Sequence, residues 1–99
     1  MMSKIYPNDF FDLGSYCWVR IIFGEKIATI ADLQAKVDPI LVPHKLKISS
    51  TVKDIRTYTM NRDSQGKPVG IKTGAGAKQL NHMDEIELGK EYWICCYHL

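Results

Sequence analysis

The most reactive side chains in this sequence are the thiols of Cys17, Cys95 and Cys96. Thiolates and imidazoles both bind zinc, and His98 follows Cys96 after one residue. Adjacent cysteines on a strand point to opposite faces, however, and no two cysteines have the two-residue separation typical of zinc sites. An odd number of cysteines without a secretory signal favours reduced thiols in the cytosol. The sequence therefore predicts free cysteines buried in a strand and no metal site.

Three other patterns suggest chemistry, but each is incomplete. Residues 73–78 read Thr-Gly-Ala-Gly-Ala-Lys. They lack the spacing of a phosphate-binding loop, so we interpret them as a flexible surface loop. The three histidines do not have zinc-site spacing, and Asp84, Glu85 and Glu87 lie together on a turn that should be solvated. No nucleophile motif occurs, so we expect no enzymatic activity and no cofactor.

Charge is distributed unevenly along the chain. The net charge is +2, but residues 45–78 carry eight basic side chains and two acidic ones, which gives this basic sector a charge of +6. Such a sector attracts nucleic acid, anionic lipid or an acidic protein surface, although spaced lysines often form only a solvated face. The candidate contact residues are Lys45, Lys47, Lys53, Arg56, Lys67, Lys72 and Lys78.

The length of 99 residues and the composition restrict the class of protein. Hydrophobic residues at 45% and charged residues at 24% are ordinary values for a globular domain. No apolar run approaches the ~20 residues of a membrane span, and the first residues lack the apolar stretch of a signal peptide. We therefore expect one domain over residues 1–99, and not a two-domain enzyme, a membrane protein or a secreted disulfide knot.

Two strands are predicted before residue 24. Residues 3–6 favour a short strand that ends at the turn signal Pro7-Asn8-Asp9, followed by a loop over residues 10–15. Residues 16–23 are rich in aromatic and β-branched side chains and form the clearest strand. One face of this strand is wholly apolar and should turn to the core: Cys17, Val19, Ile21 and Phe23.

A helix follows, with Thr29 as its predicted N-cap. Ile30, Leu33 and Val37 have helical spacing and would form the apolar stripe that packs against a sheet. We expect the helix to end at or before Asp38, because the proline that follows disfavours the α conformation in the residue before it.

The second half of the chain predicts three more strands. Residues 52–60 favour a strand, 61–67 a polar hairpin loop, and 68–71 a return strand that its proline marks as an edge. Residues 80–86 have the spacing of one or two helical turns. The last strand, residues 91–97, is apolar on both faces and should be central.

This order of elements favours the α+β class. A final apolar strand after a hairpin and a short helix suggests a ubiquitin-like β-grasp roll. In that fold we expect a mixed sheet of four to five strands, one main helix and a short second helix.

From the third predicted strand onward, the chain resembles a doublecortin domain. That family carries a V-R-x-(I/L)-Y-T strand, a glycine-lysine hairpin, an acidic leucine-flanked stretch, and a glycine before a final Y-V-type strand. The turn at Asn8-Asp9 lacks the family's glycine, and the first strand is clipped at Met1, as if the domain were trimmed from a longer protein. The matching residues are Val52, Ile55, Tyr58-Thr59, Gly66-Lys67, Val69, Leu80, Met83 to Ile86, Gly89-Lys90 and Tyr92 to Ile94.

The resemblance implies a cytoplasmic, cytoskeleton-associated module that binds microtubules between neighbouring protofilaments and stabilises the lattice. Tubulin is strongly acidic, so the basic sector would supply the cationic contacts. Of the candidate contact residues only Lys67 is a motif position of the family, and the others are chosen for their charge. We expect the domain to be monomeric in isolation and to depend on multivalency for strong binding.

Two alternatives lead to other partners. A ubiquitin-like domain could bind a protein other than tubulin through a sheet edge or the aromatic residues Tyr6, Phe10, Phe11 and Trp18. Single-stranded nucleic acid could stack on Tyr58 and Trp18 beside the lysines, but this requires exposed rings on a basic platform. Such rings more often lie in a core, so we expect a protein partner and neither nucleic acid nor membrane.

Overall fold

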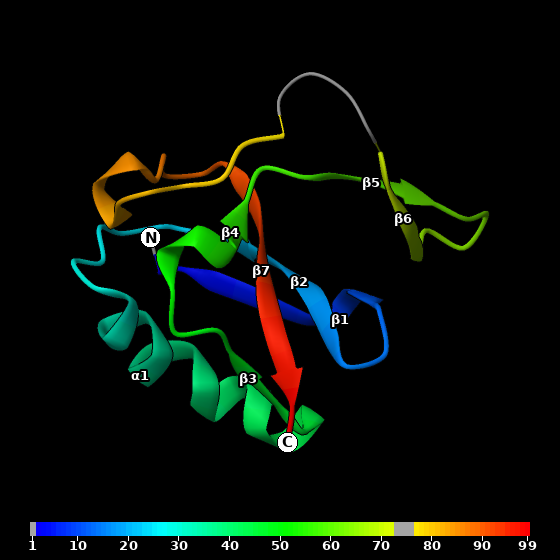
Figure 1. Cartoon of the computed structure of the whole chain (residues 1–99), viewed down its shortest axis with the longest axis horizontal. Helices are drawn as coiled ribbons and strands as arrows, with labels where there is room; N and C mark the ends of the chain where they lie inside the picture. Colours follow the sequence, from blue (N-terminus) through cyan, green and yellow to red (C-terminus); the bar gives the residue numbers. More distant parts are fainter. Residues whose placement is uncertain (1, 73–76) are drawn as a thin grey trace.

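The structure, a computed structural model, describes residues 2–72 and 77–99, so most of the predicted glycine-rich loop lies outside it. The described chain forms one main α-helix, a five-stranded sheet and a two-stranded hairpin (Figure 1), which confirms the expected α+β class. The strands are β1 (Lys4–Asp12), β2 (Tyr16–Ile22), β3 (Leu46–Ile48), β4 (Ile55–Arg56), β5 (Thr59–Arg62), β6 (Pro68–Lys72) and β7 (Glu91–His98). The helices are α1 (Ile30–Leu41) and three short 3-10 helices, η1 (Val42–His44), η2 (Val52–Asp54) and η3 (Met83–Glu85).

The large sheet has the strand order β1-β2-β7-β3, and β4 is a further partner of β7. All pairings between the described strands are antiparallel, so the expected mixed sheet is wrong. The antiparallel direction of β7 follows from where this strand begins. Glu91 at the start of β7 lies opposite Ile22 at the end of β2. The chain enters β7 at the end of the sheet where it left β2, and β7 therefore runs in the opposite direction.

Strands β2 and β7 form the centre of the sheet. β7 pairs with β2 on one side and with β3 and β4 on the other, which confirms the predicted central position of the last strand. Its residues 92–96 are buried on both faces. The predicted core face of residues 16–23 is also confirmed, since four side chains reach 0% exposure: Cys17, Val19 and Ile21 in β2, and Phe23 just after it.

Helix α1 begins as predicted but ends later. The Thr29 hydroxyl accepts a hydrogen bond from the Asp32 backbone N–H at 3.1 Å, as an N-cap does. The predicted end at Asp38 is wrong, because the helix continues through Pro39 to Leu41. Pro39 lies in the last turn, where it removes only one helical hydrogen bond, and the fully buried Leu41 holds that turn against the core. Among the described residues, no helix is both long and apolar enough to cross a membrane.

Removal of the Thr29 cap tests this helix start. Thr29→Ala is expected to lower the free energy of unfolding by about 1 kcal/mol, because the Asp32 N–H loses its acceptor. Urea unfolding followed by circular dichroism measures the change. Thr29→Ser keeps the oxygen and serves as the control. Equal losses in both variants would show that the cap does not stabilise the helix.

Strand β1 is longer than predicted because the turn signal does not end it. Tyr6 pairs with Arg20 and Phe10 with Val19, so the three residues between Tyr6 and Phe10 form a bulge inside one strand. A proline is tolerated there because β1 lies at the edge of the sheet, where a missing backbone N–H removes no inner hydrogen bond. The bulge also turns Asp9 toward Arg20 and Arg62.

The predicted strand at 52–60 is divided into η2, the two-residue β4 and β5. After β4 the chain leaves the large sheet, and β5 pairs only with β6 among the described strands. The predicted hairpin and return strand are confirmed, and Gly66 provides the positive φ of 82° that its turn requires. The helical turns expected at 80–86 reduce to η3, which is a single 3-10 turn.

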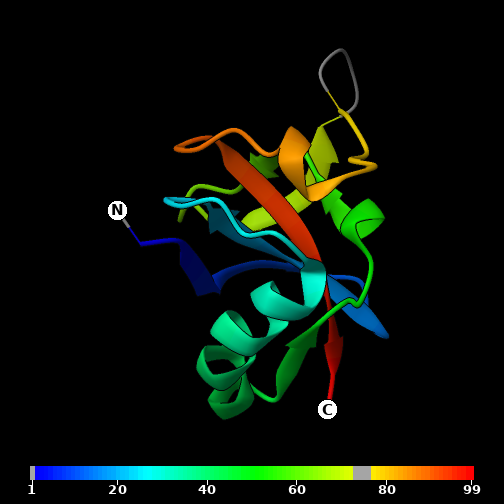
Figure 2. The same cartoon turned by 90° about the vertical axis from the view of Figure 1, so that its left-hand side faces the viewer.

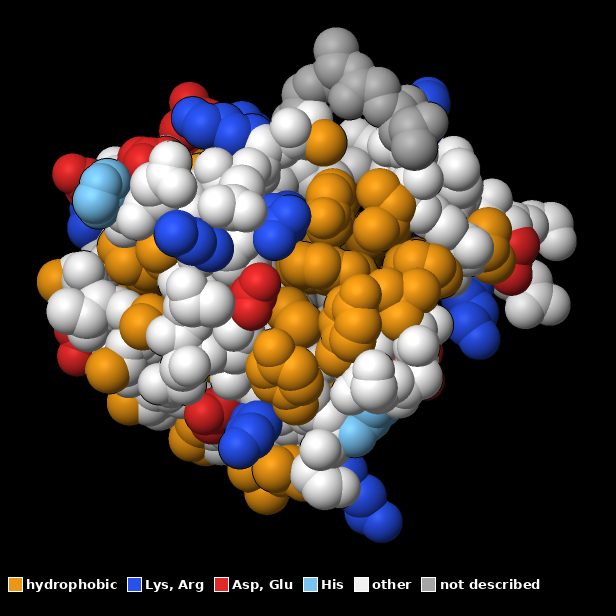
Figure 3. Space-filling model, in the orientation of Figure 1, with side chains coloured by type: hydrophobic (Ala, Val, Ile, Leu, Met, Phe, Trp, Pro, Cys, Tyr) orange, Lys and Arg blue, Asp and Glu red, His pale blue; other side chains and the backbone are white. Residues whose placement is uncertain are grey.

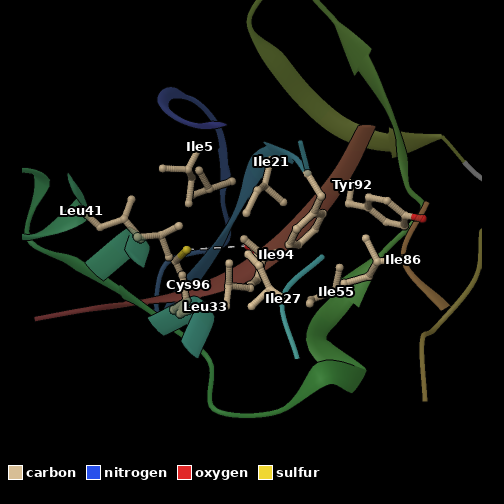
Figure 4. Packing of buried hydrophobic residues seen from close by; sticks show 14 of the residues in the cluster. Ile5, Ile21, Ile27, Leu33, Leu41, Ile55, Ile86, Tyr92, Ile94 and Cys96 are labelled. Carbon is tan, nitrogen blue, oxygen red and sulfur yellow. Dashed lines mark hydrogen bonds between the residues drawn. The ribbon is translucent and has the colours of Figure 1, made fainter. Parts of the chain in front are cut away.

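The two faces of the large sheet carry two separate clusters. On the inner face, α1 lies across the sheet (Figure 2) and its Leu33, Val37 and Leu41 pack against the apolar faces of β2 and β7. Figure 4 shows this packing around Ile21, Ile94 and Cys96. On the outer face, hairpin residues join the sheet in a second cluster, called here the outer cluster. It contains Trp18, Met60, Trp93 and Cys95, with Phe11, Tyr16, Tyr58 and Ile71 partly buried against them.

Candidate binding surface

The structure places the predicted basic residues on several elements. Figure 3 shows Lys and Arg side chains at separate points around an apolar area, and not in one continuous patch. Arg56 and Lys78 form ion pairs, each at 3.9 Å, with Asp54 and Glu85. The other five make no ion pair with the described residues. Lys45 follows η1, Lys47 is on β3, Lys53 is in η2, Lys67 is in the hairpin turn and Lys72 ends β6.

Arg56 links the basic sector to the outer cluster. Its guanidinium carbon lies 5.6 Å from the ring centre of Trp18 and 5.9 Å from that of Tyr58. Its Nε donates to the Lys53 carbonyl at 2.6 Å, and Nη1 donates to the Tyr58 hydroxyl at 3.2 Å. These contacts fix the cation over aromatic faces, where it is attracted by the ring electrons.

Strand pairing brings further aromatic residues to the same side. Tyr16 on β2 lies directly opposite Tyr97 on β7, and Tyr97 is in turn opposite Lys47 on β3. One step along the sheet, Phe11 lies opposite Trp18. We call these rings, with Tyr58, the aromatic face: Phe11, Tyr16, Trp18, Tyr58 and Tyr97.

Three rings of the aromatic face meet edge to face. Tyr16 and Trp18 have ring centres 6.2 Å apart at 82°, and Trp18 and Tyr58 have centres 4.9 Å apart at 88°. Trp18 itself is only 6% exposed, whereas Tyr97 is 41% exposed and Tyr16 and Tyr58 are partly exposed. The result is a contiguous apolar area on one side of the molecule (Figure 3). Such an area of aromatic rings beside an arginine is typical of a protein-interaction surface.

The β5–β6 hairpin covers the neighbouring part of the outer face and is held by one carboxylate. Asp9 Oδ1 and Oδ2 accept hydrogen bonds from Arg62 at 2.7 and 3.0 Å, and Arg20 Nε lies 3.1 Å from Asp9 Oδ2. The hydrogen bonds from Arg62 to Asp9 raise the pKa of the guanidinium. Arg20 also lies 4.0 Å over the ring of Tyr6. An open groove of about 590 Å³ runs between the β1 bulge and the hairpin turn.

The cysteines are free and buried, as predicted. Cys17 and Cys96 lie opposite each other on the core face, and Cys95 lies beneath the aromatic face. Burial raises the pKa of the Cys95 thiol to about 11. Among the described residues, no three metal-binding side chains lie together.

The raised pKa predicts an unreactive thiol. At pH 8 the thiolate fraction of Cys95 is expected to be about 100-fold below that of a cysteine with the ordinary pKa of 9.0, and it rises about tenfold per pH unit up to about pH 10. Because all three thiols are buried, an Ellman reaction should be slow in the native protein and fast in urea. One rapidly reacting thiol without urea would contradict the predicted burial.

The comparisons with known proteins found no matching family, no matching curated protein and no matching solved structure. The aromatic face must therefore be interpreted from its own geometry. Sequence reasoning identified Trp18, Tyr58 and Arg56 separately, but it did not identify Tyr16 and Tyr97 as members of a surface. The one available signal was that Tyr16 alternates with the core-facing residues of its strand, which places it on the opposite face.

Proposed function

We propose that this domain is a non-enzymatic protein-interaction module that binds an acidic protein through the aromatic face and the basic side chains around it. The observation that carries the proposal is the set of partly exposed rings with Arg56 fixed beside them. Tyrosine, tryptophan and arginine dominate the binding energy of protein interfaces, because they bury large areas and still offer polar groups.

Charge supports an acidic partner. Lys47 adjoins Tyr97 in the sheet, and Lys53 is in the turn that leads to Arg56. Neither lysine forms an ion pair within the described chain, so both are available to a partner. Paired charges at the rim of an interface increase the association rate and select the partner more than they add affinity.

Microtubules are the first partner to test. The doublecortin resemblance and a divergent ubiquitin-like roll are part of this proposal, and tubulin has the acidic surface that the basic side chains require. The antiparallel sheet departs from the mixed sheet expected for that roll, so the microtubule is supported by the residue resemblance and the charge alone.

Co-sedimentation with stabilised microtubules tests the proposal. We expect saturable pelleting at low salt that weakens at ~150 mM salt, where charges are screened within about 8 Å. Lys47→Glu with Lys53→Glu should abolish pelleting. The control, Lys4→Glu with Lys36→Glu, makes the same change in net charge on β1 and α1, away from Tyr97, and should leave pelleting intact.

Each of two results would overturn one part of the proposal. Absence of pelleting at low salt would rule out the microtubule as the partner. Equal loss of pelleting in the test and control variants would show that net charge matters and that the location of the lysines does not. An oligonucleotide that binds and quenches Trp18 would favour single-stranded nucleic acid instead.

A further inference from the structure

We infer that Cys17 and Cys96 are the two halves of a dithiol–disulfide couple, and that the oxidation state of this couple regulates the aromatic face. The two residues lie directly opposite each other on the central strands β2 and β7. The disulfide follows from this geometry alone, whereas its effect on binding rests on the proposed function.

The register of the sheet brings the two cysteines to the separation that a disulfide needs. Directly opposite residues of an antiparallel pair have Cα atoms about 4.5–5.5 Å apart, and disulfides join Cα atoms about 4.4–6.8 Å apart. Cys17 and Cys96 both belong to the cluster on the inner face of the sheet, so their side chains lie on the same side. A small approach of the two Cβ atoms, to about 3.8 Å, then suffices without any change of register.

The third cysteine lies on the other face of the sheet. Cys95 is opposite Trp18 and belongs to the outer cluster, so the sheet separates its thiol from the thiols of Cys17 and Cys96. Burial also raises the pKa of Cys95 to about 11, which keeps this thiol protonated. The expected disulfide is therefore specific, although Cys95 and Cys96 are neighbours in the sequence.

The two thiols of the couple have different roles. The hydrogen bond with Cys96 lowers the pKa of the Cys17 thiol, and the same hydrogen bond raises the pKa of Cys96. Since the thiolate is the nucleophile in disulfide exchange, Cys17 attacks the oxidant first. Cys96, directly opposite, then resolves the mixed disulfide.

A low-molecular-weight disulfide such as oxidised glutathione is the oxidant. The Cys17 thiolate attacks one of its sulfurs, which breaks the S–S bond and releases one glutathione. The Cys96 thiolate attacks the Cys17 sulfur of the mixed disulfide and releases the second glutathione. Two electrons pass from the cysteine pair to the oxidant, and the two thiol protons end on the two glutathione molecules. An excess of reduced glutathione reverses both steps.

Burial determines when this exchange can occur. Cys17 and Cys96 are both 0% exposed, so glutathione reaches them only while β2 and β7 are apart, during folding or an opening of the central sheet. Once the strands have closed, neither oxidant nor reductant has access to the sulfurs. The folded domain therefore keeps the oxidation state of the medium in which it folded.

The disulfide would form next to the residues of the aromatic face. The pair of Cys17 and Cys96 lies between two positions of β2 that carry this face, with Tyr16 opposite Tyr97 on one side and Trp18 on the other. Closing the disulfide draws β2 and β7 together between these positions, which changes the spacing of the rings. Oxidation should therefore change binding by the aromatic face.

Refolding in glutathione buffers tests the couple. Protein unfolded in urea is diluted into buffers with increasing ratios of oxidised to reduced glutathione, quenched with acid and alkylated. Mass spectrometry should show one intramolecular disulfide that joins Cys17 to Cys96 and leaves Cys95 alkylated. Cys95→Ala should form the same disulfide, and the neighbouring variant Cys96→Ala should form none. Circular dichroism establishes that each protein is folded before it is analysed.

Two outcomes would overturn the couple. One is folded protein without a disulfide at every glutathione ratio. The other is a disulfide that persists in Cys96→Ala, which would make Cys95 the partner of Cys17. Retention of the oxidation state has its own test, because the folded oxidised protein should resist dithiothreitol until urea is added. Rapid reduction without urea would contradict the role of burial.

Microtubule co-sedimentation and NMR test the regulation. We expect the apparent dissociation constants of the oxidised and reduced domain to differ about fivefold or more, and Cys96→Ala refolded in the same two buffers to show no difference. Equal binding of the two forms would overturn the regulation and leave the proposed function intact. If neither form pellets, the microtubule is the wrong partner, and the amide shifts of Tyr16, Trp18 and Tyr97 then decide. Shifts that do not change on oxidation would overturn the regulation without any partner.

Discussion

Replacement of Trp93 by alanine is expected to lower the free energy of unfolding by about 3–5 kcal/mol. Trp93 is 0% exposed at the centre of β7, within the outer cluster and 5.8 Å below the guanidinium of Arg62. Truncation would remove a fully buried indole from between the sheet and the hairpin and leave a cavity that the short β5–β6 hairpin cannot fill. Domains of this size are stable by only about 5–15 kcal/mol, so the variant should unfold at much lower urea.

Two controls make the Trp93 result interpretable. Tyr97→Ala removes an aromatic ring from the same strand and face, but at 41% exposure it should cost far less. Trp93→Phe keeps a ring in place and removes an indole N–H that is buried without a hydrogen-bond partner in the described residues. Trp93→Phe should therefore lower the free energy of unfolding much less than Trp93→Ala does. A loss below about 1 kcal/mol for Trp93→Ala would show that the hairpin does not pack tightly on the sheet.

Local signals in the sequence predicted the elements that depend on neighbouring residues. A few adjacent side chains determine each of three elements, and each was confirmed: the Thr29 cap, the core face of β2 and the hairpin turn between β5 and β6. Two local signals were overridden. Pro7 did not end β1, because pairing with β2 continues beyond the bulge, and Pro39 did not end α1, because Leu41 remains buried in the core.

The direction of the last strand and the aromatic face could not be predicted in this way. Both depend on which strands become neighbours after long connections. The pairing of Tyr16 with Tyr97 joins residues 81 positions apart, and Tyr58 reaches them only because the chain leaves the sheet after β4. The basic residues were identified from composition, but composition does not show that Arg56 lies over Trp18 and Tyr58.

The structure changes how the basic sector should be understood. Sequence counting treats its eight cations as equivalent, whereas the structure gives them different surroundings. Arg62 is bound to Asp9 and stabilises the hairpin, and Arg56 is held over aromatic rings. Lys47 and Lys53, in contrast, are exposed and form no ion pair in the described part of the chain. A reversal of charge therefore tests binding at the two lysines, but it would test folding at Arg62.

Replacement of Asp9 by alanine is expected to release the hairpin from the sheet. Asp9 is the shared partner of Arg20 and Arg62, and its side chain is 19% exposed while theirs are 28% and 34% exposed. Its loss would leave two guanidinium groups close together, with Glu91, 3.5 Å from Arg20, as the remaining carboxylate partner. We expect the free energy of unfolding to fall by about 1–2 kcal/mol, which allows for partial solvent screening of the pair.

The loss of stability in Asp9→Ala should be larger in the hairpin than in the central strands of the sheet. Amide hydrogen exchange is expected to accelerate more at Met60 and Ile71 in the hairpin than at Val19 and Ile94 in the central strands, because the hairpin pairs with no other described strand. Glu25→Gln is the matched control. It removes a carboxylate from an ion pair with Lys36 that is 41% and 52% exposed, and such pairs contribute little. Uniform acceleration across both regions would show that Asp9 supports the whole domain, and that the hairpin does not open by itself.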